Sequence, residues 1–303
     1  MAGLKELRTR IESIKSTHKI TAAMKMVAAS KFRRAQLTLE KSETFQKMMA
    51  DNIKKVMADI LMQEAEKGIT FIKPKFMVQP ENPKVYALFV LASDKGLCGS
   101  YNAMIAKEAQ RRINELKKAG KEVIIFCYGK KAVAGLKRHG ITDIAGAYPN
   151  VIKKHLTYAE AMGFLKDVWD KKQQYNADIC EIVYSDFLSG LAKTYLSKQV
   201  IPFDIEMTED DKKLNQHGQA FYECLPDAAD TLRQFALLYV RTKMFEILIN
   251  SQASEHAARM TSMDNASRNA QDMIKSLTFK YNTLRQSAIT TELVEIVAGA
   301  EAM

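Results

Sequence analysis

Residues 270–288 decide the fold, and their sequence is AQDMIKSLTFKYNTLRQSA. Apolar or small side chains recur in this stretch at alternating intervals of four and three residues, at Ala270, Ile274, Leu277, Tyr281, Leu284 and Ala288. This period is typical of a coiled-coil seam, in which apolar residues repeat on average every 3.5 residues. The stretch therefore predicts a helix that packs lengthwise against a second helix.

The N-terminus carries the same period and predicts the second helix. Its stripe consists of Leu4, Leu7, Ile11, Ile14, His18 and Thr21, and it is roughly extended by Val27, Ala28, Phe32, Ala35 and Leu39. Because both terminal stripes need a partner, we expect the first and last helices to pair with each other in antiparallel orientation. Several seam residues are small or polar, so the coiled coil should be slender.

The positions of glycine and proline divide the chain into three segments. Neither residue occurs from Leu4 to Lys67 or in the 72 residues that precede Gly299 after Pro226, whereas eleven of the thirteen glycines lie from Gly68 to Gly218. Since glycine and proline interrupt regular structure, we predict a coiled-coil helix over 1–67, a central domain with its connections over 68–226, and a coiled-coil helix over 227–303. A helix of 72 residues is about 108 Å long, so most of it should protrude from a domain about 30 Å across.

The middle segment alternates between strand and helix patterns. We predict strands at 85–92, 123–128 and 179–184, a further strand over 191–201 at an edge, and helices over 102–118, 130–138 and 158–174. The continuous apolar run Val85 to Ala92 fits a strand that is buried on both faces. This order predicts an α/β fold, a Rossmann-like domain with a largely parallel sheet.

Residues 93–102, SDKGLCGSYN, follow the first predicted strand, where ligands of parallel sheets often bind. The loop lacks the glycine spacing of a dinucleotide fold or a P-loop, so a tight turn is favoured over a phosphate cradle. Cys98 could be a nucleophile at a helix N-terminus, but a packed cysteine is favoured. The five histidines show no metal-ligand spacing, so we expect no catalytic site, no nucleotide site, no metal and no cofactor.

Net positive charge is concentrated at the N-terminus, whereas residues 227–303 contain 8 Lys and Arg against 9 Asp and Glu and are nearly neutral overall. Residues 1–60 contain 13 Lys and Arg against 6 Asp and Glu. A basic helix could bind nucleic acid or an acidic protein surface. Only Phe32 and Phe45 are aromatic in this segment, which disfavours base stacking. The four cysteines form no CxxC pair, which favours a reducing compartment, and the longest apolar run has eight residues, against roughly 18 for a membrane span.

The last residues are unusually apolar for an exposed helix end. Apolar side chains occur at Leu293, Val294, Ile296, Val297, Ala298 and Ala300, and the only charges are Glu292, Glu295 and Glu301. A protruding end of this composition needs a cover. The N-terminal helix can cover only one side, so we expect an apolar socket on another protein.

Four separated motifs resemble the γ subunits of F-type ATP synthases. The C-terminal motif is ITTELVEIVAGA at 289–300, and the N-terminal motif comprises Arg10-Ile11, Lys19–Thr21, Ala23-Met24 and MVAASK at 26–31. The central motif comprises Ser93-Asp94, GLCG at 96–99 and Asn102, and the fourth comprises Ser254-Glu255 and AARM at 257–260. The motifs occur in the family's order and extend over nearly the whole chain.

The resemblance implies the central shaft of a rotary motor with no catalytic site of its own. The coiled coil would turn inside three α and three β subunits, and the central domain would rest on a membrane c ring together with the ε subunit. Flow of protons or sodium ions would drive ATP synthesis at the α and β sites. The protein would bind no nucleic acid and would lie on the cytoplasmic face of a bacterial inner membrane, or on the matrix face in a mitochondrion, with membrane contact only through the complex.

Position by position, the resemblance implies contacts with β at Met24, Arg259, Gln286, Thr290 and Glu292. It implies an approach to the c ring at Tyr222 and Glu223. The chain departs from the family pattern at 61–83 and 214–226. From the residues alone, a basic coiled-coil scaffold or nucleic-acid-binding protein and an α/β enzyme that uses Cys98 remain alternatives.

Overall fold

The structure is a computed structural model that describes residues 2–67, 74, 76–149, 156–189, 192–203, 224 and 227–301. The chain forms two compact units. The helix-pair unit comprises residues 1–30, 97–99 and 256–303, and the sheet unit comprises residues 31–96 and 100–255. Each of the two long helices, α1 (Ala2–Lys67) and α6 (Ala228–Glu301), contributes to both units. The division into 1–67, 68–226 and 227–303 stays a prediction.

The sheet unit contains five strands in the order β3-β2-β1-β4-β5. These are β1 (Val85–Leu91), β2 (Glu122–Tyr128), β3 (Gly146–Tyr148), β4 (Ile179–Ser189) and β5 (Ala192–Ile201). β1, β2, β3 and β4 pair in parallel, whereas β5 pairs antiparallel with β4 at the edge. The predicted α/β class with a largely parallel sheet and an edge strand near 191–201 is therefore confirmed. β3 was not predicted.

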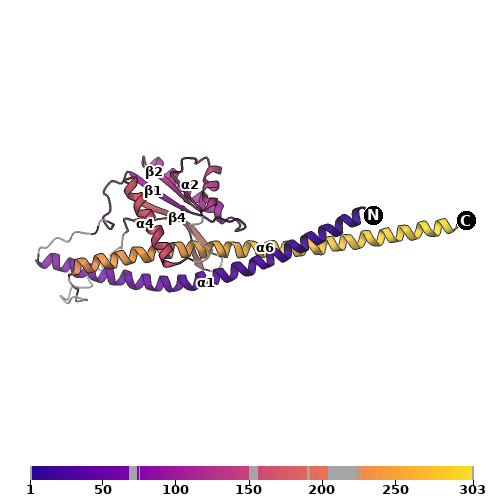
Figure 1. Cartoon of the computed structure of the whole chain (residues 1–303), viewed down its shortest axis with the longest axis horizontal. Coiled ribbons are helices and arrows are strands. Elements are labelled where there is room, and N and C mark those ends of the chain that lie inside the picture. Colours follow the sequence, from indigo (N-terminus) through magenta and orange to yellow (C-terminus); the bar gives the residue numbers. More distant parts are fainter. Residues whose placement is uncertain are drawn as a thin grey trace. The chain divides into compact units, whose positions relative to one another are not determined.

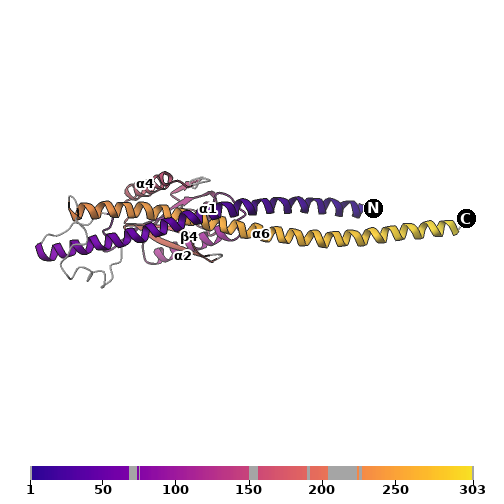
Figure 2. The ribbon, with the colours of Figure 1, turned by 90° about the horizontal axis from the view of Figure 1, so that it is seen from below.

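Among the described residues, three shorter helices accompany the sheet: α2 (Tyr101–Lys118), α3 (Lys130–Arg138) and α4 (Tyr158–Gln174). Figures 1 and 2 show α2 and α4 on opposite faces of the sheet. Alternate residues of β1 supply the two faces. Phe89 and Leu91 belong to the core that includes α4 and the α6 residues around Ile247, whereas Tyr86 packs with Leu116 of α2. The sheet is thus buried on both sides, as its apolar run predicted.

A glycine fixes the turn that leaves β2. Gly129 has a φ of 94°, and a Cβ at this position would lie 2.1 Å from the carbonyl oxygen of Ala92. Only glycine adopts this conformation without steric conflict. The backbone of β2 can therefore pass close to the end of β1 before α3 begins.

In the helix-pair unit, the first part of α1 runs antiparallel to the last part of α6. Ile11, Thr21 and Ala28 of α1 are buried, and so are Met263 and Ala270 of α6. The seam period is therefore confirmed, with two corrections. Leu284 occupies a seam position but is 45% exposed, because it lies opposite the first turn of α1, where few α1 side chains can cover it. Val27 is 57% exposed, because the seam position seven residues after Thr21 is Ala28.

Candidate functional site

The end of α6 extends beyond its partner helix, and this overhang is the candidate functional site. The Nζ atom of Lys25 lies 2.6 Å from Oδ1 of Asp264, which sets the register of the antiparallel pair. Because both helices rise equally per residue, the start of α1 at Ala2 reaches the level of about residue 287. Residues 288–301 therefore have no α1 residue at their level, and Figures 1 and 2 show the C-terminal end extending past the N-terminal end.

The overhang exposes large apolar side chains. The exposed fractions are 49% for Ile289, 57% for Leu293, 62% for Val294, 67% for Ile296 and 56% for Val297. At 100° per residue, these five side chains fall within an arc of about 160° on the helix. They form what we call the tip face. A contiguous apolar surface of this kind marks an interaction site.

The tip face is not a continuation of the coiled-coil seam. After Ala288, the seam period continues through Thr291, Glu295 and Ala298, which are polar or small. The large apolar residues lie on the other side of the helix. They would therefore stay exposed even if α1 were longer, and they require a partner other than α1.

Phe279 extends this exposed side toward the paired part of the helix, and sequence analysis missed it. It is 76% exposed, and its position between the seam residues Leu277 and Tyr281 turns it away from α1. An aromatic residue two positions from each neighbouring seam residue is a sequence pattern that could have identified it.

The predicted contact residues Gln286, Thr290 and Glu292 all lie on α6 and are exposed. The Thr290 hydroxyl donates a hydrogen bond to the carbonyl oxygen of Gln286 at 2.9 Å. The hydroxyl oxygen of Thr290 can still accept a hydrogen bond from a partner. Because Thr290 is exposed, its side chain is also open to apolar contact. Polar contact residues thus precede and border the tip face.

Met24 and Arg259, the other two predicted contact residues, lie in the paired part of the unit. Met24 is half-buried, next to the Lys25–Asp264 ion pair. The register places Arg259 at about the level of Ser30, roughly 9 Å along the axis from the level of Met24. The Nη1 atom of Arg259 lies 3.5 Å from Nδ1 of His256. The two residues therefore lie on facing helices at different levels.

The ion pair beside Met24 contains a third charged group. Asp264 also contacts the guanidinium of Arg268, one turn further along α6. The hydrogen bond from Lys25 lowers the pKa of the Asp264 carboxyl, and the Arg268 charge acts in the same direction. Asp264 thus stays ionised at neutral pH and connects the two helices electrostatically.

The loop 93–102 is a hydrogen-bonded turn, as the preferred interpretation predicted. The Ser93 amide donates to Oδ1 of Asn102 at 3.0 Å, and the Lys130 amide donates to Oδ1 of Asp94 at 3.0 Å. Gly99 has a φ of 58°. The Ser93 amide of the loop and the Lys130 amide, which lies outside the loop at the start of α3, are therefore already bonded to side chains, and one of these is a carboxylate. This geometry argues against the phosphate cradle.

The described residues do not support a nucleophilic Cys98 or a metal site. Cys98 is 2% exposed, so a substrate cannot reach its sulfur. No group of three or more metal-ligating side chains occurs among the residues that the structure describes. Tyr222 and Glu223 lie outside those residues. None of the described helices combines the length and the apolar content that a membrane-spanning segment needs.

Comparisons with known proteins identify relatives over the whole chain and solved structures with a similar fold. A sequence model of the ATP synthase family matches residues 3–303. The ATP synthase gamma chains of Paramagnetospirillum magneticum, Rhodospirillum rubrum and Erythrobacter litoralis are 38%, 37% and 39% identical, with full coverage of both chains in each case. Among solved structures, one match is a chain from the central stalk and c-ring of the Tetrahymena thermophila mitochondrial ATP synthase. It has a TM-score of 0.53 and 25% identity, and the match covers 82% of this chain and 99% of that one. A chain of the Euglena gracilis mitochondrial enzyme matches with a TM-score of 0.63 over 100% and 95%, and at 16% identity it supports the fold alone.

Proposed function

The chain belongs to the γ-chain family of F-type ATP synthases, whose members form the central stalk, and from this premise we propose that its paired terminal helices turn inside a ring of three α and three β subunits. Rotation would be driven by proton or sodium flow through a membrane c ring. Each β subunit would then pass in turn through states that bind ADP and phosphate, form ATP and release it.

The tip face is the observation that supports this proposal most directly. Its side chains are apolar, exposed and turned away from α1. Apolar contact is not directional, so a socket can hold the tip while the helix changes its angle. A set of fixed ion pairs would favour one angle and oppose rotation.

Coupling needs contacts whose free energy differs between the states of β. We assign these contacts to Met24, Arg259, Gln286, Thr290 and Glu292, and we add Phe279 to them. The exposed basic residues of α1 would face acidic groups of β, which favours close approach without apolar burial. We assign the c-ring contact to Tyr222 and Glu223.

The chain itself would carry out no chemistry. The buried Cys98 and the hydrogen-bonded amides of Ser93 and Lys130 support a non-catalytic subunit of the complex. We place the ε subunit and the c ring beside the sheet unit. The complex would hold the chain at the cytoplasmic face of a bacterial inner membrane or at the matrix face in a mitochondrion.

Native isolation tests the assignment. A complex purified through a tag on this chain should contain α and β in three-to-one excess over it, and ATPase activity should be lost when the chain is depleted. Recovery of the chain alone, or binding to DNA that weakens steeply with salt, would contradict the proposal and support the basic-scaffold alternative.

Met24→Lys tests the coupling contact. A new cation facing acidic groups of β should hold one rotary state too firmly, and it should lower the number of ions pumped per ATP by about two- to fivefold. Met26→Lys is the matched control, since Met26 is 69% exposed and lies on a different side of α1. An unchanged ratio in the Met24 variant would remove Met24 from the coupling contacts.

A further inference from the structure

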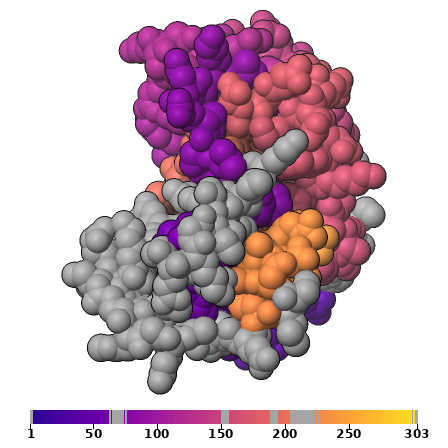
Figure 3. Space-filling model, turned by 90° about the vertical axis from the view of Figure 1, so that its left-hand side faces the viewer, coloured from indigo at the N-terminus to yellow at the C-terminus, as the bar shows by residue number. Residues whose placement is uncertain are grey.

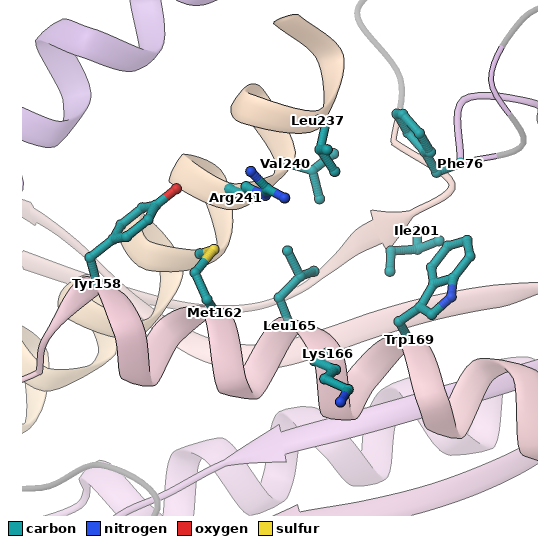
Figure 4. A pocket seen from close by; sticks show the side chains of 10 residues that line it. All are labelled: Phe76, Tyr158, Met162, Leu165, Lys166, Trp169, Ile201, Leu237, Val240 and Arg241. Carbon is teal, nitrogen blue, oxygen red and sulfur yellow. The ribbon is translucent and has the colours of Figure 1, made fainter. Parts of the chain in front are cut away.

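The sheet unit contains an apolar cavity of about 390 Å³ between α4 and the first turns of α6 (Figure 4). One side is formed by Tyr158, Met162, Leu165 and Trp169, whose spacing of four, three and four residues puts them on one face of α4. Figure 3 shows the start of α6 (orange) at the surface beside the segment that contains α4 (pink). The volume falls within the range of small-molecule sites, roughly 300–1,000 Å³.

The opposite side of the cavity comes from α6 and from two chain segments at its end. Leu237 is 38% exposed at the surface and Val240 is 7% exposed, so this side runs from the solvent into the core. Phe76 and Ile201 line the end near Trp169 (Figure 4). A ligand could therefore enter past Leu237 and bury its apolar part against aromatic and aliphatic side chains.

Charge in the cavity has one sign. The charged lining residues are Lys166 and Arg241, and the described lining contains no acidic residue. In Figure 4 the amine of Lys166 points away from the cavity, whereas the guanidinium of Arg241 lies between α6 and α4. Within the described part of the chain no carboxylate forms an ion pair with Arg241. This guanidinium is the charge that a ligand in the cavity would meet.

We propose that this cavity binds an amphipathic organic anion, a carboxylate on an apolar chain of medium length. The apolar chain would lie against Trp169 and Met162, and the carboxylate would pair with Arg241. Methionine adapts its shape to irregular ligands, and a guanidinium accommodates both oxygens of a carboxylate. This site is separate from the tip face, so it stands or fails independently of the rotary assignment.

Trp169 provides a specific readout, because it is the only tryptophan in the chain. Decanoate added to the full-length chain should change the Trp169 emission in a saturable way. Octanoate should bind about tenfold more weakly, because it buries two fewer methylene groups. Decanol should bind about three- to fivefold more weakly than decanoate, because it lacks the charge.

Substitutions separate the contribution of apolar contact to the binding affinity from the contribution of the Arg241 charge. Arg241→Gln should abolish the preference for decanoate over decanol and leave decanol binding within twofold. Leu237→Glu should weaken decanoate at least tenfold by placing a carboxylate at the entrance, and the exposure of Leu237 makes this variant compatible with folding. The matched control is Arg233→Gln on the same helix, which should leave both affinities unchanged.

Four results would overturn the proposal, and the first three concern the isolated chain. They are the absence of a saturable Trp169 response to decanoate, equal affinities for decanoate and decanol in the unmodified chain, and an Arg233 variant that behaves like the Arg241 variant. A response present in the isolated chain but lost in the native complex would also overturn it, since the cavity would then be the seat of a partner subunit's side chain.

Discussion

Simultaneous replacement of Leu293, Val294, Ile296 and Val297 by alanine should abolish tight docking of the tip without destabilising the isolated chain. These side chains are 56–67% exposed. Each can therefore still gain roughly 1–2 kcal/mol when a partner buries it. Because alanine keeps part of this gain and hot-spot effects do not add, we expect a total loss of about 3–5 kcal/mol.

This loss corresponds to an affinity of the chain for the α–β assembly that is roughly 150- to 4,000-fold weaker. In the isolated chain the same four changes should each alter the free energy of unfolding by less than about 0.5 kcal/mol, because exposed side chains have few internal contacts. Alanine also favours the helix more than valine does. Titration of α–β with labelled chain measures the first quantity, and urea unfolding of the chain measures the second.

The matched control replaces two exposed apolar residues outside the tip face. Leu37 and Met48 on α1 are 53% and 61% exposed, so Leu37→Ala with Met48→Ala removes apolar surface of the same kind. The control should bind α–β with unchanged affinity. Equal affinities for the tip variant and the unmodified chain would refute the socket, and equal losses in both variants would show that general surface hydrophobicity drives assembly.

Three further predictions concern the sheet unit. Gly129→Ala should cost roughly 3–5 kcal/mol of unfolding free energy, because a φ of 94° and a backbone contact at 2.1 Å both oppose a Cβ; an unchanged urea midpoint would contradict this. Glu181→Gln should cost about 2–3 kcal/mol, because Glu181 is 4% exposed and its carboxylate accepts the Arg112 Nε hydrogen bond at 2.7 Å. The variant leaves the partly buried guanidinium with only the longer contact to Glu115 at 3.5 Å, and the same urea assay measures the loss. Burial raises the pKa values of the Cys127 and Cys180 thiols to about 12. They should therefore resist a thiol reagent at pH 8 until the chain unfolds, and stability should fall as pH rises from about 9 toward 12, because the unfolded thiols ionise first.

Periodicity was sufficient for the long elements of the fold and insufficient for the short ones. The seam period and the lack of glycine and proline predicted α1 and α6, and the apolar run at 85–92 predicted β1. β3 has three residues, too few for any period, and it is a strand because Gly146 pairs with Phe126 of β2. β4 extends to Ser189, beyond the predicted end at Tyr184, because it pairs with β5 as far as that residue.

The candidate site was only partly predictable for a similar reason. Apolar composition alone identified the overhang. The register could not be predicted, because a seam that repeats every seven residues fits its partner equally well after a shift of seven. The Lys25–Asp264 pair selects one register, and only then does the level of Ala2 define which residues of α6 lack a partner.

Part of the exposed side of α6 lies within the region paired with α1, and this bears on force transmission. Phe279 and Gln286 face away from α1 at levels where Tyr281 still lies half-buried in the seam. A partner that presses on Phe279 therefore presses on a segment that α1 supports from behind. The tip face beyond Ala288 lacks this support, so it can hold position in an apolar socket but can resist little bending. If the proposed contacts are right, lateral force from β should act mainly on the paired region, through Met24, Phe279 and Gln286. The overhang would serve as the bearing, and its contacts Thr290 and Glu292 would carry less of the force.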